Sequence, residues 1–452
     1  MKEDIITAAA TAWGYGGIAI VRLSGEGCVS LAEKIILSKR TFHTQPPRYM
    51  SLVTLCGRDG EPFDEALAVR FERGGSYTGE ESAEIQCHGG LLAAQRCVEE
   101  LCAFGARLAE PGEFTRRAFV NGRINLAQAE AVAGIIKAES DEALSASARS
   151  LQNHFTDEIK SLMQRMTELS AALEVDLDFP EEGEGFIAHS ARAERLKSLV
   201  NECRALKERC RCGMLLRDGV RAAIIGAPNV GKSSLLNALL AKNRAIVTSI
   251  PGTTRDSIEE TFIYKGMPVR ITDTAGIRET NDEIEAIGVR RSLKSMKEAD
   301  IILRVVDTSA DMPNADAISS DNKRTIIVMN KCDLPAKFTE CDARRIFGCD
   351  NVISISAATG EGIDELKKMI FALSTSDGDI TNGYSVTLRQ LECITNAENA
   401  LTAALESVSY DMGDDIAVSC VFEAVSSLAS LLGADASEEI LDKIFGTFCV
   451  GK

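Results

Sequence analysis

This 452-residue chain has few aromatic residues, few histidines and a deficit of positive charge. Aromatic residues make up 5% of the sequence and hydrophobic residues 45%, so any buried core must be mainly aliphatic. Its 50 Lys and Arg residues are outnumbered by 67 Asp and Glu, which gives a net charge of −17. Because phosphate backbones are bound by clusters of Lys and Arg, such a chain should not hold nucleic acid unaided. RNA binding would need a local basic patch or a basic partner.

Metal sites built from Cys and His are not expected either, because the 14 cysteines follow no framework spacing and only 4 histidines are present. Most of the thiols should be small buried hydrophobes in a reducing cytosol. The start Met1-Lys2-Glu3-Asp4 lacks the basic and apolar blocks of a signal peptide. The most apolar segment, 417–432, contains Glu423 and several serines, which favours a buried helix over a membrane span. These features predict a cytoplasmic protein.

One stretch is much more specific. Residues 226–233 read Gly-Ala-Pro-Asn-Val-Gly-Lys-Ser, a complete G-x-x-x-x-G-K-S loop, and they follow the apolar run Val220–Ile225. A strand, a glycine-rich loop and a helix in that order let backbone N–H groups and the helix N-terminus surround phosphate oxygens. Lys232 should reach the outer phosphates, and the Ser233 hydroxyl should ligate Mg²⁺. The alternative, a chance glycine turn before a surface lysine, is disfavoured by four further elements in the expected order.

Three of these elements each follow an apolar strand. Asp273-Thr274-Ala275-Gly276 comes after strand 269–272, where the carboxylate can hold Mg²⁺ through water and the glycine N–H can contact a γ-phosphate. Asn330-Lys331-Cys332-Asp333 comes after strand 325–329. The two oxygens of Asp333 match two N–H donors on one edge of guanine, so the site should select GTP over ATP. Ser356-Ala357-Ala358, after strand 352–355, should contact the base through its backbone.

The remaining element is the switch sequence 248–256. Thr254 is assigned as the Mg²⁺ ligand that enters with the γ-phosphate, with Thr253 as the alternative. Many GTPases place a glutamine after Asp-x-x-Gly to orient the attacking water, but this chain has Ile277 there and no identifiable arginine finger. Asn229 is therefore a candidate ligand for a monovalent cation that would supply the missing charge beside the phosphates.

The predicted GTP-binding residues are Asn229, Val230, Gly231, Lys232, Ser233, Ser234, Thr248, Ser249, Ile250, Pro251, Gly252, Thr253, Thr254, Asp273, Thr274, Ala275, Gly276, Asn330, Lys331, Cys332, Asp333, Ser356, Ala357 and Ala358.

The pattern along the chain predicts a multidomain protein. Residues 1–120 mix short β-like runs with glycine turns and indicate an α+β domain. Residues 121–216 are helical, with a long helix or broken pair over 125–175 and another helix over 190–214. Residues 217–376 alternate strands and helices, as in a doubly wound, mostly parallel α/β sheet with the nucleotide at the strand C-termini. Residues 377–452 are helical again, with helices expected over 386–407, 416–432 and 437–445. The α/β GTPase domain is thus predicted to be inserted into a discontinuous α-helical domain.

The whole chain resembles the MnmE (TrmE) family of tRNA-modification GTPases. The phosphate loop with Asn229 and the string 252–256 are shared with related GTPases such as Era and Der. The more specific strings are Ser76-Tyr77-Thr78-Gly79-Glu80, His88-Gly89-Gly90, Pro111-Gly112-Glu113-Phe114-Thr115-Arg116-Arg117-Ala118-Phe119, Ala127-Gln128-Ala129-Glu130-Ala131 and the tail Cys449-Val450-Gly451-Lys452.

The resemblance implies an N-terminal domain that binds tetrahydrofolate and forms a homodimer. It implies a K⁺-dependent GTPase that also uses Mg²⁺ and works in a heterotetramer with the FAD-dependent partner MnmG. The expected substrate is tRNA, modified at C5 of the wobble uridine to an aminomethyl or carboxymethylaminomethyl product. The one-carbon unit would come from 5-formyl- or methylene-tetrahydrofolate. No membrane is involved.

The resemblance also assigns roles to individual residues. The K⁺ ligands would be Asn229, Thr248, Ile250 and Thr253, and the Mg²⁺ ligands Ser233 and Thr254. Glu285 would orient the hydrolytic water, and Cys449 would be a catalytic thiol. The folate positions are Arg22, Glu84, Arg123 and Lys452.

Without the resemblance, some of these residues have plainer readings. Glu285 would be part of a solvated acidic face, and Cys449 an inert terminal thiol. His88 is better explained as a hydrogen-bonded core histidine than as a ligand. The chain also departs from the family at 12–17, where Ala-Trp-Gly-Tyr-Gly-Gly replaces a common Pro-Pro-Gly-Arg-Gly-Gly, and at Arg123, where lysine is common. Arg and Lys are not interchangeable at a geometric site, so the detail of folate binding should differ.

A second interpretation is a ribosome-assembly GTPase of the Era or Der type. Such a protein should carry a duplicated phosphate loop or a C-terminal RNA-binding domain with a basic G-x-x-G loop. This chain has one phosphate loop and an acidic helical C-terminal part that ends in a cysteine motif. The tRNA-modification interpretation is favoured.

Overall fold

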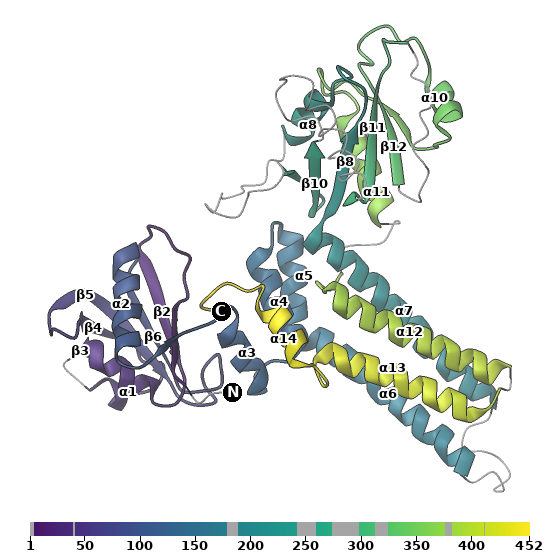
Figure 1. The fold of residues 1–452 in the computed structure, drawn as a ribbon. Helices are drawn as coiled ribbons and strands as arrows, with labels where there is room; N and C mark the ends of the chain where they lie inside the picture. The colour runs from purple at the N-terminus through teal and green to yellow at the C-terminus, as the bar shows by residue number, and fades with distance from the viewer. Residues whose placement is uncertain are drawn as a thin grey trace. The chain divides into compact units, whose positions relative to one another are not determined.

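The computed structural model describes residues 4–38, 41–178, 189–241, 259–273, 298–311, 324–375, 382–410 and 412–452. The chain forms two compact units, the first made of Met1–Ala133 with Val425–Lys452 and the second of Gly134–Ala424 (Figure 1). The four-part division at residues 120, 216 and 376 remains a prediction.

The first unit contains a seven-stranded sheet in the order β3-β4-β5-β6-β2-β1-β7. All neighbouring strands are antiparallel except β1 and β7, which are parallel. The strands are β1 (Ile6–Ala9), β2 (Ile18–Ser24), β3 (Ile36–Leu37), β4 (Ser51–Cys56), β5 (Pro62–Phe71), β6 (Ser82–His88) and β7 (Arg107–Leu108). The helices are α1 (Cys28–Ala32), α2 (Leu91–Ala103), α3 (Glu113–Val120) and α14 (Glu438–Phe445), with 3-10 turns η1 (Glu33–Ile35) and η2 (Phe42–Thr44).

Strand alternation gives this sheet two different faces. On β2, Ala19, Val21 and Leu23 are buried in a core with residues of α1 and α2. Successive side chains of a strand point to opposite faces, so Arg22 lies on the other face. Glu84 pairs in register with Arg22 and lies on that face too, because its neighbours Ala83 and Ile85 are in the core. The face away from α1 and α2 therefore carries two of the predicted folate residues.

The second unit contains a six-stranded sheet in the order β13-β12-β11-β8-β10-β9. Every neighbouring pair is parallel except β9 with β10. The strands are β8 (Val220–Ile225), β9 (Glu259–Tyr264), β10 (Met267–Asp273), β11 (Ile301–Asp307), β12 (Arg324–Asn330) and β13 (Val352–Ser354). The helices around it are α8 (Lys232–Leu240), α10 (Glu340–Phe347) and α11 (Ile363–Thr375).

Both faces of this sheet are covered, which confirms the predicted α/β arrangement. On β11, Val305 packs with residues of α8 and α11, while the next residue, Val306, packs with Phe338 and Ala343 on the opposite face. Continuous apolar strands of this kind are typical of parallel sheets buried on both faces.

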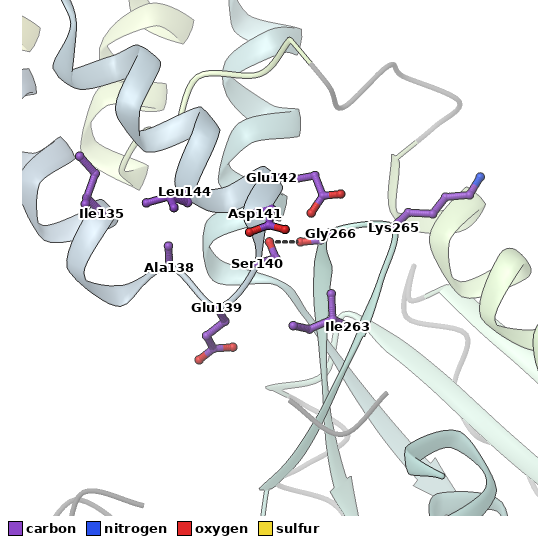
Figure 2. A pocket seen from close by; sticks show the side chains of 10 residues that line it. All are labelled: Ile135, Ala138, Glu139, Ser140, Asp141, Glu142, Leu144, Ile263, Lys265 and Gly266. Carbon is purple, nitrogen blue, oxygen red and sulfur yellow. Dashed lines mark hydrogen bonds between the residues drawn. The ribbon is translucent and has the colours of Figure 1, made fainter. Parts of the chain in front are cut away.

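The remaining helices are α4 (Leu126–Lys137), α5 (Asp141–Leu151), α6 (Asn153–Asp178), α7 (His189–Asp218), α12 (Leu388–Ser409) and α13 (Asp414–Leu432). The predicted helical region 125–175 is thus broken into three helices. Helices α7 and α12 pack together, and Arg204 and Lys207 of α7 both pair with the buried Glu398 of α12. The turn between α4 and α5 contacts the β9–β10 hairpin (Figure 2).

Helix α13 is long and apolar enough, by length and composition alone, to cross a membrane. One such helix is weak evidence for a span, and core helices pass the same test. The structure buries one stripe of it at helical spacing and leaves Phe422 exposed. The buried stripe consists of Ala417, Val421, Ala424, Leu428 and Leu431.

Two expectations about single side chains need correction. All 14 cysteines are free thiols, but six are buried, six are half-buried and two are exposed, so burial is less general than predicted. His88 is not a core residue. It ends β6 with its side chain 74% exposed, and its Nδ1 lies 2.5 Å from Asp64 Oδ1. Its neighbour Cys87 points into the core, so alternation along β6 turns His88 to the opposite face, where it pairs with Asp64 of β5.

Candidate functional site

Four of the five predicted nucleotide motifs begin at the C-terminal ends of strands in the six-stranded sheet, and the fifth, the switch sequence, lies outside the described residues. Strand β8 leads into the phosphate loop, β10 ends at Asp273, β12 ends at Asn330, and β13 leads to Ser356. Strand β8 lies between β10 and β11, where the order of strands along the chain changes direction. Ligands of open α/β sheets bind at such a switch point, outside the carboxyl ends of the strands.

The phosphate loop presents its polar groups at the start of α8. Asn229 is exposed and has a φ of 64°, a left-handed conformation that asparagine tolerates better than most residues. The Lys232 ammonium donates to the carbonyls of Gly226 (2.9 Å) and Ala227 (2.8 Å). Ser233 and Ser234 are exposed in the first turn of the helix. The loop can therefore offer backbone N–H groups, an ammonium and hydroxyls to phosphate and its metal.

Asn330 joins the phosphate loop to the predicted base-binding loop. Its amide nitrogen donates to the carbonyl of Val230 at 2.8 Å, and its amide oxygen accepts from the N–H of Ala357 at 3.0 Å. The residue is 2% exposed, and a buried amide needs hydrogen-bond partners for both its nitrogen and its oxygen, which these two bonds supply. Three segments far apart in sequence are thereby held together.

Lys331 reinforces the same junction. Its ammonium donates to the carbonyl of Asn229 at 3.2 Å and to Asp307 at 2.6 Å. Burial raises the pKa of Asp307, but hydrogen bonds from Lys331 and Ser309 outweigh it, so the pKa lies below its ordinary value. Sequence reasoning missed Asp307, although a carboxylate at the end of an apolar strand beside the motif strands was a usable signal.

The residues predicted to bind the base lie in two neighbouring loops that follow β12 and β13. Asp333 is exposed beside this junction, and the N–H of Cys332 donates to the carbonyl of Ile355 at 3.1 Å. Ser356 is buried and its hydroxyl accepts from the N–H of Thr359. The loops that carry Asp333 and Ala357 are therefore joined to each other by backbone and side-chain hydrogen bonds.

Several predicted residues lie outside the described residues, and of Asp273 only the backbone is described. The predicted residues outside the described ranges are Thr248, Ser249, Ile250, Pro251, Gly252, Thr253, Thr254, Thr274, Ala275, Gly276 and Glu285.

In the first unit, three of the four predicted folate residues converge on the loop 76–80 and helix α3. Arg22 and Glu84 form an ion pair of 2.8 Å, with side chains 18% and 19% exposed. The Arg22 guanidinium lies 5.5 Å from the ring centre of Tyr77 and 5.7 Å from that of Phe114. The side chain of Arg123 packs against Gly79. The result is a charged, partly enclosed surface with an aromatic wall.

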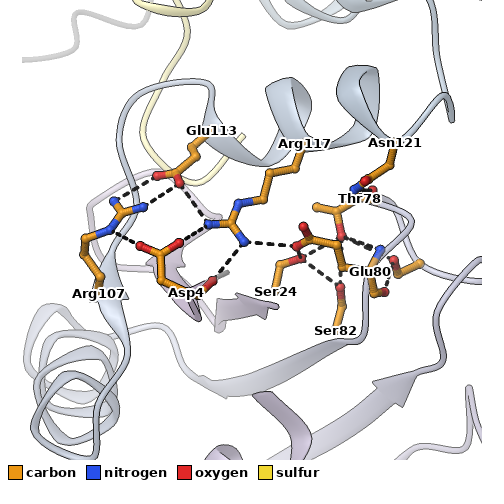
Figure 3. Close-up of polar contacts among 10 residues, drawn as sticks. Asp4, Ser24, Thr78, Glu80, Ser82, Arg107, Glu113, Arg117 and Asn121 are labelled. Carbon is orange, nitrogen blue, oxygen red and sulfur yellow. Dashed lines mark hydrogen bonds and ion pairs between the residues drawn. The ribbon is translucent and has the colours of Figure 1, made fainter. Parts of the chain in front are cut away.

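A buried ion network holds this loop on α3 (Figure 3). Arg117 is 3% exposed and contacts Glu80 (3.1 Å), Asp4 (2.7 Å) and Glu113 (3.1 Å). Arg107 pairs with Asp4 and Glu113 from the other side. A guanidinium taken out of water must be matched by carboxylates, and here three surround it.

Two hydrogen bonds complete the attachment. The Tyr77 hydroxyl lies 3.0 Å from that of Thr115, and the Asn121 amide donates to the carbonyl of Thr78 at 2.8 Å. Burial raises the pKa of Tyr77, so its hydroxyl stays protonated. The sequence assigned no site role to Tyr77 or Arg117, although both stand in the strings that carry the family resemblance.

The C-terminal tail lies on the same unit, although it is hundreds of residues away in sequence. Gly451 is buried with a φ of 93°, and a Cβ on it would lie 2.2 Å from the carbonyl oxygen of Ala9. The carbonyl of Cys449 accepts from the N–H of Gly112 at 3.4 Å. Ala9 pairs with Val21, the neighbour of Arg22 in β2. The exposed Cys449 therefore lies in a segment that packs on β1, the strand next to the one that carries Arg22.

Comparison with protein families gives two matches that together span most of the chain. A family model described as the MnmE helical domain matches residues 126–449, and one described as GTP-binding protein TrmE N-terminus matches residues 5–123.

Curated relatives match over the full length. A tRNA modification GTPase MnmE from Symbiobacterium thermophilum is 41% identical over 463 residues, covering 100% of both chains. Proteins of the same name from Clostridioides difficile and Aquifex aeolicus are each 39% identical, covering 100% of this chain and 99% and 100% of their own. Among solved structures, an Aquifex aeolicus Era variant bound to GDP·AlF4⁻ is 30% identical and covers 41% of this chain and 67% of its own, with a TM-score of 0.28.

Proposed function

Since the chain belongs to the MnmE family of tRNA modification GTPases, we propose that it hydrolyses GTP in a K⁺-dependent reaction that serves modification of the tRNA wobble uridine at C5. The chain is a GTP hydrolase. The proposal concerns the cation, the partner and the chemistry on tRNA.

The proposed K⁺ site is supported by Asn229. Its side chain is exposed on the phosphate loop, and its own carbonyl is held by Lys331, which fixes the direction of the residue. An amide oxygen is a suitable ligand for a hard cation. Bound K⁺ would supply positive charge beside the phosphates, a role often filled by an arginine. Thr248, Ile250 and Thr253 would complete its shell, and Ser233 with Thr254 would hold Mg²⁺.

The proposed tetrahydrofolate site is supported by the surroundings of Arg22. The Arg22–Glu84 pair offers donors and acceptors in a fork geometry, and Tyr77 offers a flat ring beside it. A bicyclic pterin and a glutamate tail need that combination of hydrogen-bonding groups, ring stacking and positive charge. Arg123 and Lys452 would contribute the further positive charge. The bound folate would supply the one-carbon unit.

The proposal that Cys449 takes part in tRNA modification is supported by a single observation, the packing of Gly451 against Ala9. This contact brings the exposed Cys449 to the unit that holds Arg22. The Cys449 thiol would act there as nucleophile or general acid/base.

A homodimer is proposed through the face of the first sheet that α1 and α2 leave uncovered. Ile18, Leu52 and Leu67 are 60%, 67% and 37% exposed on that face. Exposed apolar side chains that share one face often mark an interface, and a two-fold dimer would bury the same residues on each subunit. The net charge of −17 supports a second, basic partner for holding tRNA, and we propose the FAD-dependent MnmG in a cytoplasmic heterotetramer.

Mass analysis of wobble uridines tests the function directly. We expect cells that lack this protein to lose the C5-substituted wobble uridine, and the wild-type gene to restore it. A Cys449→Ser gene should leave GTP hydrolysis intact and fail to restore the modified uridine. Normal wobble uridines in cells without the protein would refute the tRNA proposal and leave the GTPase assignment untouched.

A further inference from the structure

The tip of the β9–β10 hairpin is fixed to the turn between α4 and α5 (Figure 2). The Ser140 hydroxyl donates to the carbonyl of Gly266 at 2.6 Å. The same oxygen accepts from the N–H of Ala143 at 3.1 Å and so forms the N-cap of α5. One hydroxyl therefore joins the start of a helix to the tip of a hairpin, and displacement of the hairpin would disturb the helix cap.

The hairpin turn has no spare room at this contact. Lys265 and Gly266 have φ values of 48° and 78°, as expected for a two-residue hairpin turn. A Cβ on residue 266 would lie 2.4 Å from the Glu142 carboxyl carbon and 2.6 Å from its Cβ. The glycine is thus required by its backbone conformation and also by the closeness of Glu142.

A second contact holds the middle of strand β10. The Arg270 guanidinium pairs with Glu139 at 3.2 Å and donates to the carbonyl of Asp218, the last residue of α7, at 3.4 Å. Both side chains of the ion pair are about one-third exposed, at 30% and 35%. The hairpin contact, defined as Glu139, Ser140 and Glu142 with Gly266 and Arg270, borders an open cavity of about 720 Å³.

The hairpin connects this contact to the nucleotide site. Strand β10 ends at Asp273, three residues after Arg270, which is a distance of about 10 Å along an extended strand. Strand β9 begins at Glu259, three positions after the last residue of the switch sequence 248–256. A shift of β10 relative to β8 would move Asp273 and break the contacts of Arg270 and Gly266 together.

We propose that Glu139, Ser140 and Glu142 are positioning residues for GTP hydrolysis. By holding the hairpin, they fix the end of β10 and hence the backbone of Asp273 relative to the phosphate loop. The same contact would also couple the α4–α5 turn to the bound nucleotide, because a nucleotide that moves β10 must change the packing of that turn. Any coupling of this kind between two binding equilibria is reciprocal.

The first test substitutes Gly266 by alanine in the full-length chain. We expect kcat for GTP to fall about tenfold, equivalent to about 1.4 kcal/mol in the barrier. The affinity for GDP should stay within about twofold of the wild type, because the phosphate and base loops are not touched. Such a split marks an interaction needed mainly in the transition state. Gly348→Ala is the matched control. That glycine has a φ of 59° and no atom within 4 Å of the position of a Cβ.

The second test exchanges the charges of the ion pair. Arg270→Glu and Glu139→Arg should each lower kcat, and the double variant should recover most of the loss, because the pair is restored in reverse. Arg345→Glu, which breaks the exposed Arg345–Asp342 pair of α10, should have no effect. Melting temperatures measured in parallel separate positioning from loss of folding, since a merely structural role would lower stability and GDP affinity together.

The third readout is hydrogen exchange of residues 134–145 with GDP and with a non-hydrolysable GTP analogue. The wild type should show different protection in the two states, and Gly266→Ala should abolish the difference. Equal protection of this turn in both nucleotide states of the wild type would overturn the proposal. So would a Gly266→Ala enzyme with the kcat of the Gly348→Ala control.

Discussion

Replacing Gly451 by alanine should detach the C-terminal tail from the first unit. The residue has a φ of 93°, where a side chain costs about 1–2 kcal/mol. Its new Cβ would also lie 2.2 Å from the Ala9 oxygen and 3.0 Å from the Ala10 Cα, which are backbone atoms of a strand and cannot rotate away. A cost of about 2 kcal/mol or more lowers the ratio of docked to undocked tail by about 30-fold or more.

The control is Gly105→Ala in the same unit. Gly105 has a φ of 114° and no atom within 4 Å of a Cβ, so it carries the backbone strain without the collision. Hydrogen exchange should show lost protection of residues 446–452 in Gly451→Ala and not in the control. Wobble-uridine modification should fall in the same variant, while GTP hydrolysis stays at the wild-type rate. A detached tail together with normal tRNA modification would refute the reasoning that Cys449 acts at the Arg22 site.

Four further predictions test other parts of the molecule. Exchange of K⁺ for Na⁺ should lower kcat about a hundredfold or more. Asn229→Ala and Asn229→Gly should each lower kcat in K⁺ to a similar extent. Equal turnover in the two salts would refute the proposed cation site. Glu285→Ala should keep nucleotide affinity and lose most of kcat, whereas the reverse pattern in binding and turnover assays would make Glu285 structural. Asp333→Asn should shift preference from GTP toward xanthosine triphosphate, because the new amide donates where the carboxylate accepted, and an unchanged competition assay would show that the base is bound elsewhere. The hydrogen bond from Arg107 is the main cause that lowers the pKa of Asp4. The ionised Asp4 therefore stabilises the fold above its ordinary pKa of 3.8, and this stabilisation is lost as the pH falls further. The melting temperature should thus decline less steeply below about pH 4 in Arg107→Met than in the wild type.

The candidate nucleotide site shows how much of a site can be predicted from sequence motifs alone. The phosphate loop and the strings at Asn330 and Ser356 were recognisable because each follows an apolar strand, and parallel strands place their C-terminal ends at one edge. That rule predicted that these loops would meet, as Asn330 now shows by binding both Val230 and Ala357. The same rule could have marked Asp307 as a carboxylate at a strand end, but not its pairing with Lys331, which directly follows the neighbouring strand β12, because strand order is a tertiary property.

The sequence by itself determined the family, the alternating α/β pattern of the GTPase region and the residue types available to bind GTP. Local propensity, hydrophobic period and short motifs are encoded within a few residues, and so they can be found without a fold. Only the tertiary structure decided that Arg117 lies buried among three carboxylates, that Gly451 packs on Ala9 and that Gly266 meets Ser140 and Glu142. Those contacts join segments up to hundreds of residues apart. Many side chains could form such contacts, and packing and strand register, rather than local pattern, decide which of them meet.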